Sequence, residues 1–180
     1  MNDSWCSIAL SRCLPVVLLA ASLLLAGGCS GGGCEPGELC ECAYGEECYL
    51  GCEGGGCDQV CYDVSTCGGV CGDDCSFACR RARDCSSSCG DDCASECRDV
   101  TSCGTLCGAN CDYRCFRASR CGARVGDGSQ VRCQDVGSCE VECDGSCRVT
   151  CQQVGGCNVT CSNGMAASSC ADGTLACGPC

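Results

Sequence analysis

The chain has 180 residues and a formal net charge of −12, and 33 of its residues are cysteines. After Cys29 it carries only 22 large apolar or aromatic side chains, too few for an ordinary hydrophobic core, so cross-links or metal ions must stabilise the fold. It has no histidine and no lysine, which excludes Cys/His zinc fingers, Ser-His-Asp hydrolases and lysine-dependent chemistry. Nucleic-acid binding is disfavoured, because 22 acidic residues face 10 arginines after Cys29.

The N-terminal segment has the pattern of an export signal. Residues 13–28 form an apolar run that is shorter than the roughly 20 residues needed to span a bilayer. The run ends in Leu25-Ala26-Gly27-Gly28-Cys29, which resembles the lipobox of bacterial lipoproteins. The resemblance implies that residues 1–28 are a signal peptide, that Cys29 receives diacylglycerol and, from Ser30, that the protein is sorted to the outer membrane. The alternative is an ordinary secretory signal cleaved near Ala26 to Gly28, with Cys29 unmodified.

The parity of the cysteines gives an independent indication. Cys6 and Cys13 would leave with the signal peptide and Cys29 would carry the lipid, so 33 minus 3 leaves 30 cysteines, enough for 15 disulfides. Cleavage without lipidation would leave an odd thiol.

The cysteines follow an internal repeat. From Cys67 they recur in steps of 4, 4, 4 and 6 residues, a period of 18, and an earlier copy from Cys48 has one extra residue in the stretch Gly54–Gly56. Such periodicity is the signature of stacked units. The cysteines of this framework are Cys67, Cys71, Cys75, Cys79, Cys85, Cys89, Cys93, Cys97, Cys103, Cys107, Cys111, Cys115, Cys121, Cys133, Cys139, Cys143, Cys147 and Cys151. The same period holds for an apolar column (Val64, Ala82, Val100, Ala118, Val136, Val154) and a column of alternating charge (Asp63, Arg81, Asp99, Arg117, Asp135).

The segments between turns favour strands. In 139–143, 147–151 and 157–161, Cys and Val alternate with polar residues, and Gly-Asp or Gly-Asn turns separate such segments. We therefore predict a small, disulfide-rich, all-β protein, a parallel β-solenoid of about seven 18-residue coils. The alternative is a stack of disulfide-linked helical hairpins, because cysteines four residues apart also share a helical face. The expected organisation is a signal peptide (1–28), a lipidated tether and N-terminal cap (29–47), the repeats (48–164) and a C-terminal cap (165–180).

One irregular coil suggests the disulfide connectivity. In residues 121–138 the second and third cysteines are replaced together by Val125 and Ser129, whereas Cys121 and Cys133 remain. Joint loss favours nested pairing inside each coil, second with third and first with fourth. Vertical pairing between neighbouring coils is the alternative, but it would leave Cys147 without a partner.

The sequence contains three candidate chemical sites. Cys177-Gly178-Pro179-Cys180 resembles the thioredoxin-type redox motif, which implies a redox pair; the alternative is structural disulfides at the end of the chain. Thiolate clusters could bind metal, but they need reduced cysteines and an exported protein meets an oxidising compartment. The turn acids Asp73, Asp91 and Asp127 are candidate calcium ligands along one edge of the solenoid, the alternative being a solvated acidic edge.

The expected function is therefore not catalytic. No cluster of acids, bases and nucleophiles presents itself, and no cofactor is predicted. We expect a lipid-anchored, cysteine-rich protein of the cell envelope with a structural or binding role, attached to the membrane by its N-terminal lipid and binding an envelope or surface partner that the sequence does not identify. The alternative is a thiolate-based metal-binding or disulfide-exchange protein.

Overall fold

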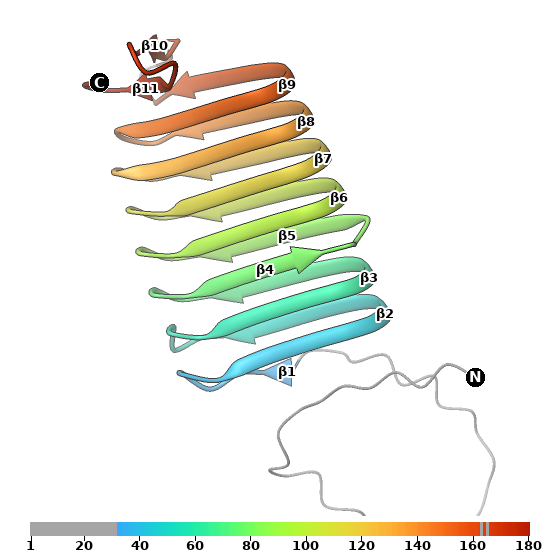
Figure 1. Ribbon diagram of the computed structural model, residues 1–180. Helices are drawn as coiled ribbons and strands as arrows, with labels where there is room; N and C mark the ends of the chain where they lie inside the picture. The colour runs from blue at the N-terminus through green and yellow to red at the C-terminus, as the bar shows by residue number, and fades with distance from the viewer. Residues whose placement is uncertain (1–31, 163, 165) are drawn as a thin grey trace, which may run out of the picture.

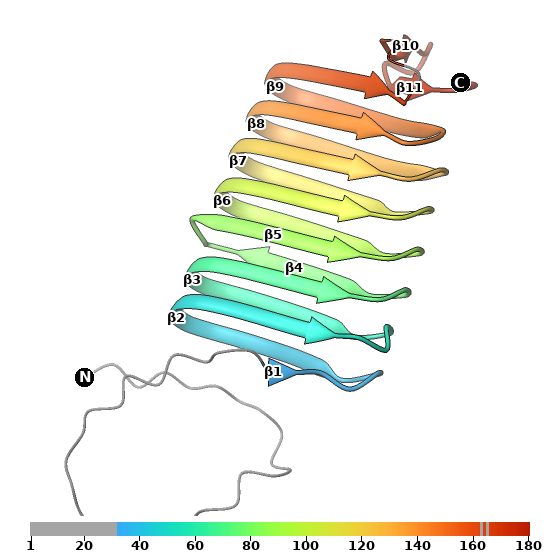
Figure 2. The same ribbon diagram turned by 180° about the vertical axis from the view of Figure 1, so that it is seen from behind.

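The computed structural model describes residues 32–180 except 163 and 165, so the signal segment and Cys29 lie outside the described residues. The described chain is all-β, a parallel β-solenoid of seven stacked coils (Figures 1 and 2). The predicted fold class is confirmed, and the alternative of helical hairpins is wrong, because the alternating pattern places Cys and Val on one side of extended strands. Within the described range no helix is long and apolar enough to cross a membrane.

In each coil the chain runs along one wall of the stack, bends, and returns along the opposite wall (Figure 1). The sequence pattern predicts two short strands joined by a longer turn, but the structure continues the strand through the bend in every coil except the third. A tight turn then leads to the next coil. The strands are β2 (Leu39–Cys52), β3 (Asp58–Cys71), β4 (Ser76–Arg80) with β5 (Asp84–Cys89), β6 (Ala94–Cys107), β7 (Asp112–Val125), β8 (Ser129–Cys143) and β9 (Cys147–Cys161).

The strand register follows the 18-residue period. Cys67 lies opposite Cys85, which lies opposite Cys103, and the same offset continues to β9. Between β2 and β3 the offset is 19 residues, as in the pair Cys48 and Cys67, because the extra residue is taken up in the turn at Gly54–Gly56. Since β2 begins at Leu39, residues 39–47 belong to the first coil rather than to an N-terminal cap.

The bends and the turns depend on left-handed backbone. The residue at each bend has φ between 51° and 58°, and this position coincides with the column of alternating charge. The tight turns use the same conformation, at φ 56–57° for Asp74, Asp92 and Asn110, which is a conformation that Asp and Asn tolerate better than most residues. The bend residues are Tyr44, Asp63, Arg81, Asp99, Arg117, Asp135 and Gln153.

Complementary side-chain sizes fill the narrow space between the walls. Phe77 on one wall packs against Gly69 on the other, where an added Cβ would lie 2.5 Å from Phe77 Cδ2. One coil further, the buried hydroxyls of Ser87 and Ser95 hydrogen-bond at 3.0 Å. Tyr113 is buried in the following coils, and its phenol donates to the Cys103 carbonyl at 3.5 Å. The core is therefore thin, and a large side chain on one wall is accommodated by a small residue on the other wall.

Short segments cover the two ends of the stack. At the N-terminal end β1 (Gly32–Gly33) pairs with Leu50 and Gly51, on the returning half of β2. At the C-terminal end β11 (Leu175–Cys177) pairs antiparallel with the first residues of β9, and β10 (Ser168–Ser169) pairs with β11. Residues 166–180 thus cover the last coil, as Figure 2 shows.

Candidate functional site

All 30 cysteines from Cys34 to Cys180 are paired, in 15 disulfides. Five of them close the tight turns: Cys52–Cys57, Cys71–Cys75, Cys89–Cys93, Cys107–Cys111 and Cys143–Cys147. Seven close the bends: Cys42–Cys48, Cys61–Cys67, Cys79–Cys85, Cys97–Cys103, Cys115–Cys121, Cys133–Cys139 and Cys151–Cys157. The others are Cys34–Cys40, Cys161–Cys177 and Cys170–Cys180.

The predicted nested connectivity is half right. The second cysteine of each unit does pair with the third, as in Cys71–Cys75. The fourth, however, pairs with the first cysteine of the next unit, as in Cys79–Cys85, and not with the first of its own. The reason is that these two cysteines flank a bend and have Cα atoms 6.3 Å apart, within normal bridging distance. Vertical pairing does not occur among the described cysteines.

The irregular coil shows how a turn closes without its disulfide. Val125 and Ser129, the two replacements, are both almost fully buried. The Ser129 hydroxyl accepts a hydrogen bond from the Cys111 amide at 3.1 Å and donates one to the Gly108 carbonyl at 3.4 Å. A hydroxyl and an apolar side chain therefore replace the covalent bond at this turn.

The two cysteines of the thioredoxin-like motif are not joined to each other. Cys177 pairs with Cys161 at the end of β9, and Cys180 pairs with Cys170 in the C-terminal segment. A redox disulfide of the thioredoxin type would join the two motif cysteines. In this geometry Cys177 instead fastens the C-terminal segment to the last coil, and Cys180 closes a loop within that segment.

Sulfur atoms of neighbouring disulfides lie close together in three places. In each triplet the sulfurs lie within 4.8 Å of one another, and each consists of one disulfide and a sulfur of an adjacent one. As disulfides these sulfurs offer no thiolate to a metal ion. The triplets are Cys52, Cys71 and Cys75; Cys89, Cys93 and Cys107; and Cys143, Cys147 and Cys177.

The candidate calcium ligands lie along the turn edge and hydrogen-bond to the next coil. Asp73 Oδ1 accepts from the Asp91 amide at 2.8 Å, and Asp91 Oδ1 accepts from the Ala109 amide at 2.7 Å. Asp127 Oδ1 accepts from both the hydroxyl and the amide of Ser146, which lowers the pKa of Asp127. Among the described residues no three carboxylates come within ligand distance of one another. The geometry gives these acids a role as turn caps.

The bend edge carries ion pairs between stacked coils. Arg81 binds Asp63 through two hydrogen bonds of 2.6 and 2.7 Å, and Arg117 binds Asp99 at 2.6 Å. The hydrogen bonds from Arg81 lower the pKa of Asp63. The structure therefore confirms that these charged residues stack along the bend edge. They form separate ion pairs, each of one aspartate and one arginine, rather than one continuous row of contacts.

The outer surface of the first wall, which we call face A, is rich in charge. It carries Arg80, Arg98, Arg114, Arg132 and Arg148, together with Glu41, Asp58, Glu96 and Asp112. The Arg98 guanidinium lies 5.5 Å from the centre of the Phe116 ring. The Tyr62 hydroxyl donates to Glu41, and this hydrogen bond raises the pKa of Tyr62 to about 12.

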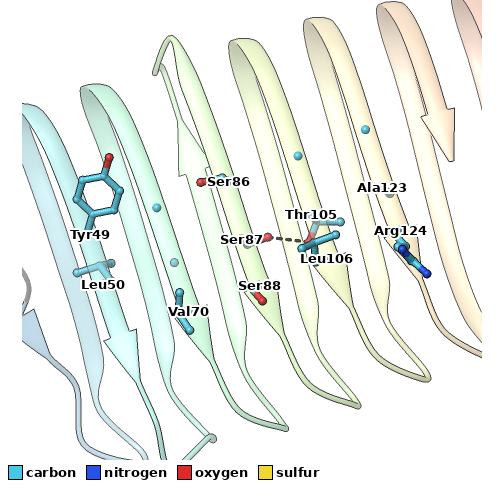
Figure 3. Close-up of a pocket in the computed structure, with 14 residues that line it drawn as sticks. Tyr49, Leu50, Val70, Ser86, Ser87, Ser88, Thr105, Leu106, Ala123 and Arg124 are labelled. Carbon is cyan, nitrogen blue, oxygen red and sulfur yellow. Dashed lines mark hydrogen bonds between the residues drawn. The ribbon is translucent and has the colours of Figure 1, made fainter. Parts of the chain in front are cut away.

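The outer surface of the second wall, which we call face B, has a different character (Figure 3). Over β2 to β7 its two outward columns are Tyr49, Gly68, Ser86, Gly104, Gly122 and Gly51, Val70, Ser88, Leu106, Arg124. All of these residues except Gly51 line a shallow groove of about 590 Å³. Tyr49, Val70 and Leu106 are more than half exposed, and Arg124 is the one charged residue of these columns.

Sequence reasoning missed the difference between the two faces. The repeat shows which residues point outward, but it does not show that small residues at four successive positions leave a groove. A count of outward residues by column, once the bend was placed, could have found it.

Searches of protein families, of curated proteins and of solved structures find no match to this chain.

Proposed function

We propose that this chain is an exported, lipid-anchored protein of the cell envelope with a structural or binding role and without catalytic activity. The observation that carries the proposal is the pairing of all 30 described cysteines. Disulfides form and persist mainly in oxidising compartments, which supports export. Cys29 carries the lipid in this proposal, and Ser30 directs the protein to the outer membrane.

The use of the polar side chains supports a role that is not catalytic. The cysteines from Cys34 onward are in disulfides, and the turn carboxylates accept backbone hydrogen bonds from the next coil. What the solenoid offers instead is two long, flat faces of different chemistry on a cross-linked frame, which suits binding or spacing at a surface.

A second candidate is a disulfide-exchange or thiolate metal-binding protein. The three sulfur triplets favour it, because reduction of one disulfide would place two thiolates within 4.8 Å of a neighbouring disulfide sulfur. In this case some of the cysteines would be reduced in the cell.

The intact mass of the natively exported protein, with and without reduction and alkylation, tests both candidates. We expect a diacylglyceryl group on Cys29 and 30 fewer hydrogens than the all-thiol form, because each of 15 disulfides removes two. A Cys29→Ser variant is the control, since it loses the lipid and keeps the disulfides. Several alkylatable cysteines, or zinc or copper retained under native conditions, would contradict the structural role and support the second candidate.

A further inference from the structure

We infer that face B over β2 to β7 is a membrane-contact surface, so that the solenoid lies on the lipid surface along this side. The inference rests on the proposed lipid anchor and deepens it, because it names the surface that the anchored protein presents to the bilayer. Three independent features of the described chain point to it: apolar exposure, charge, and the place where the N-terminal segment enters the fold.

Exposed apolar side chains are concentrated on face B. Of the five large apolar side chains that are exposed among the described residues, three lie there: Val70 at 63%, Leu106 at 56% and Tyr49 at 51%. The Tyr49 ring covers Gly68, where an added Cβ would lie 2.5 Å from the ring. A tyrosine at one end of an apolar strip is typical of surfaces that rest in the headgroup region.

The charge on face B fits a lipid surface. In a chain of net charge −12, the two columns over β2 to β7 contain no carboxylate and one arginine, Arg124. The one arginine of these columns is already paired, because Arg124 binds Asp144 at 2.8 Å and lies opposite Glu142 in β8. At the bend edge, outside the columns, lie Glu47 and Asp84, and Asp84 is paired with Arg83 at 2.8 Å. Face A, in contrast, carries charged side chains in nearly every coil, and these side chains would lose their hydration on contact with lipid.

The entry of the chain places the proposed anchor on the same side. β1 pairs with Leu50 and Gly51, next to Tyr49, at the N-terminal end of face B. In the sequence Cys29 precedes Gly32 by only three residues, so the proposed lipid is tethered to this end of the stack by a short segment. Along the stack the apolar strip begins at this end, whereas Glu140 and Glu142 occupy the corresponding columns in β8, farther from the anchor.

Tryptophan fluorescence can test the orientation, because the sole tryptophan of the chain, Trp5, lies in the segment removed with the signal peptide. The Leu106→Trp variant reports on face B, and the Phe116→Trp variant on face A is the matched control. The lipidated proteins are reconstituted in phosphatidylethanolamine and phosphatidylglycerol vesicles, with and without acyl-chain bromination. We expect a blue shift and roughly twofold stronger quenching for Leu106→Trp, because an interfacial surface sits about 5–10 Å into the headgroup boundary.

The outcomes separate the orientation from the anchor. Equal quenching of the two variants, or none in either while the lipidated protein stays on the vesicles, overturns the orientation and leaves the anchor intact. A blue shift of Leu106→Trp without vesicles that grows with protein concentration overturns it too, because a second copy then covers face B. If intact mass shows no lipid but Leu106→Trp is still quenched on vesicles, the surface contact is supported and the anchor is wrong.

Discussion

At the scale of single residues, the thin core tolerates size changes only where the opposite wall leaves room. Gly69 faces Phe77 and Gln59, and atoms of these two side chains lie 2.5 and 2.6 Å from the position of an added Cβ. The Gln59 side chain is held in place, because its Nε2 donates a hydrogen bond to the Val70 carbonyl at 3.2 Å. We expect Gly69→Ala to lower the free energy of unfolding by about 1–3 kcal/mol, the usual cost of overpacking. Denaturant unfolding of the oxidised protein measures the effect.

Gly104→Ala is the matched control, because nothing lies within 4 Å of its added Cβ. We expect this change to stay within about 0.5 kcal/mol of the parent chain. Equal destabilisation by both substitutions would show that backbone conformation, and not the packing of Phe77, decides the cost.

The bend ion pair between Arg81 and Asp63 makes a prediction about pH. The pKa of Asp63 is lowered in the fold, first by hydrogen bonds from Arg81, so the pairing stabilises the protein above the unfolded pKa of about 3.9 and is lost as pH falls through the folded pKa. We expect Arg81→Gln to return the pKa of Asp63 toward its usual value, measured by NMR titration of the carboxyl carbon. Arg117→Gln should leave the pKa of Asp63 unchanged, since Arg117 binds Asp99. A rise of the Asp63 pKa in that control would contradict the conclusion that the two ion pairs are separate.

At the scale of the coil, Val125 and Ser129 suggest that a turn disulfide is replaceable. We expect the double variant Cys89→Val with Cys93→Ser to keep the solenoid and lose about 2 kcal/mol, the chain-entropy value for so short a loop. Mass spectrometry should show one disulfide fewer, and denaturant unfolding should give the loss.

The single variant Cys89→Val is the informative comparison. It leaves the Cys93 thiol beside the sulfur of Cys107, within one of the sulfur triplets, so we expect mixed disulfides and heterogeneous products on a non-reducing gel. A homogeneous single variant with a free Cys93 would mean that the triplets do not support exchange.

The repeat period predicts the coil and its register well, and predicts the disulfide partners less well. An 18-residue period fixes which residues stack, so Cys67 opposite Cys85 follows from the sequence. A cyclic pattern, however, has no marked starting point, and dividing it at Cys67 assigned the fourth cysteine and its true partner, the first cysteine of the next unit, to different units. The left-handed backbone of Arg81 at the bend was also not predictable, because an arginine there has no local preference for that conformation.

At the scale of the whole molecule, backbone hydrogen bonds join neighbouring coils, and cross-links supplement a thin apolar core. Much of the buried set is cystine sulfur, and the other inward residues include Gln59, Ser87, Ser95 and Thr105, which bring little hydrophobic free energy. Each coil contacts only its neighbours, so the loss of all disulfides removes the constraint from every coil at once. We therefore expect full reduction and alkylation to abolish the β-sheet circular dichroism signal of the exported protein. Alkylation without prior reduction should leave that signal unchanged, and a reduced chain that retained its strands would show that backbone pairing alone is sufficient for the fold.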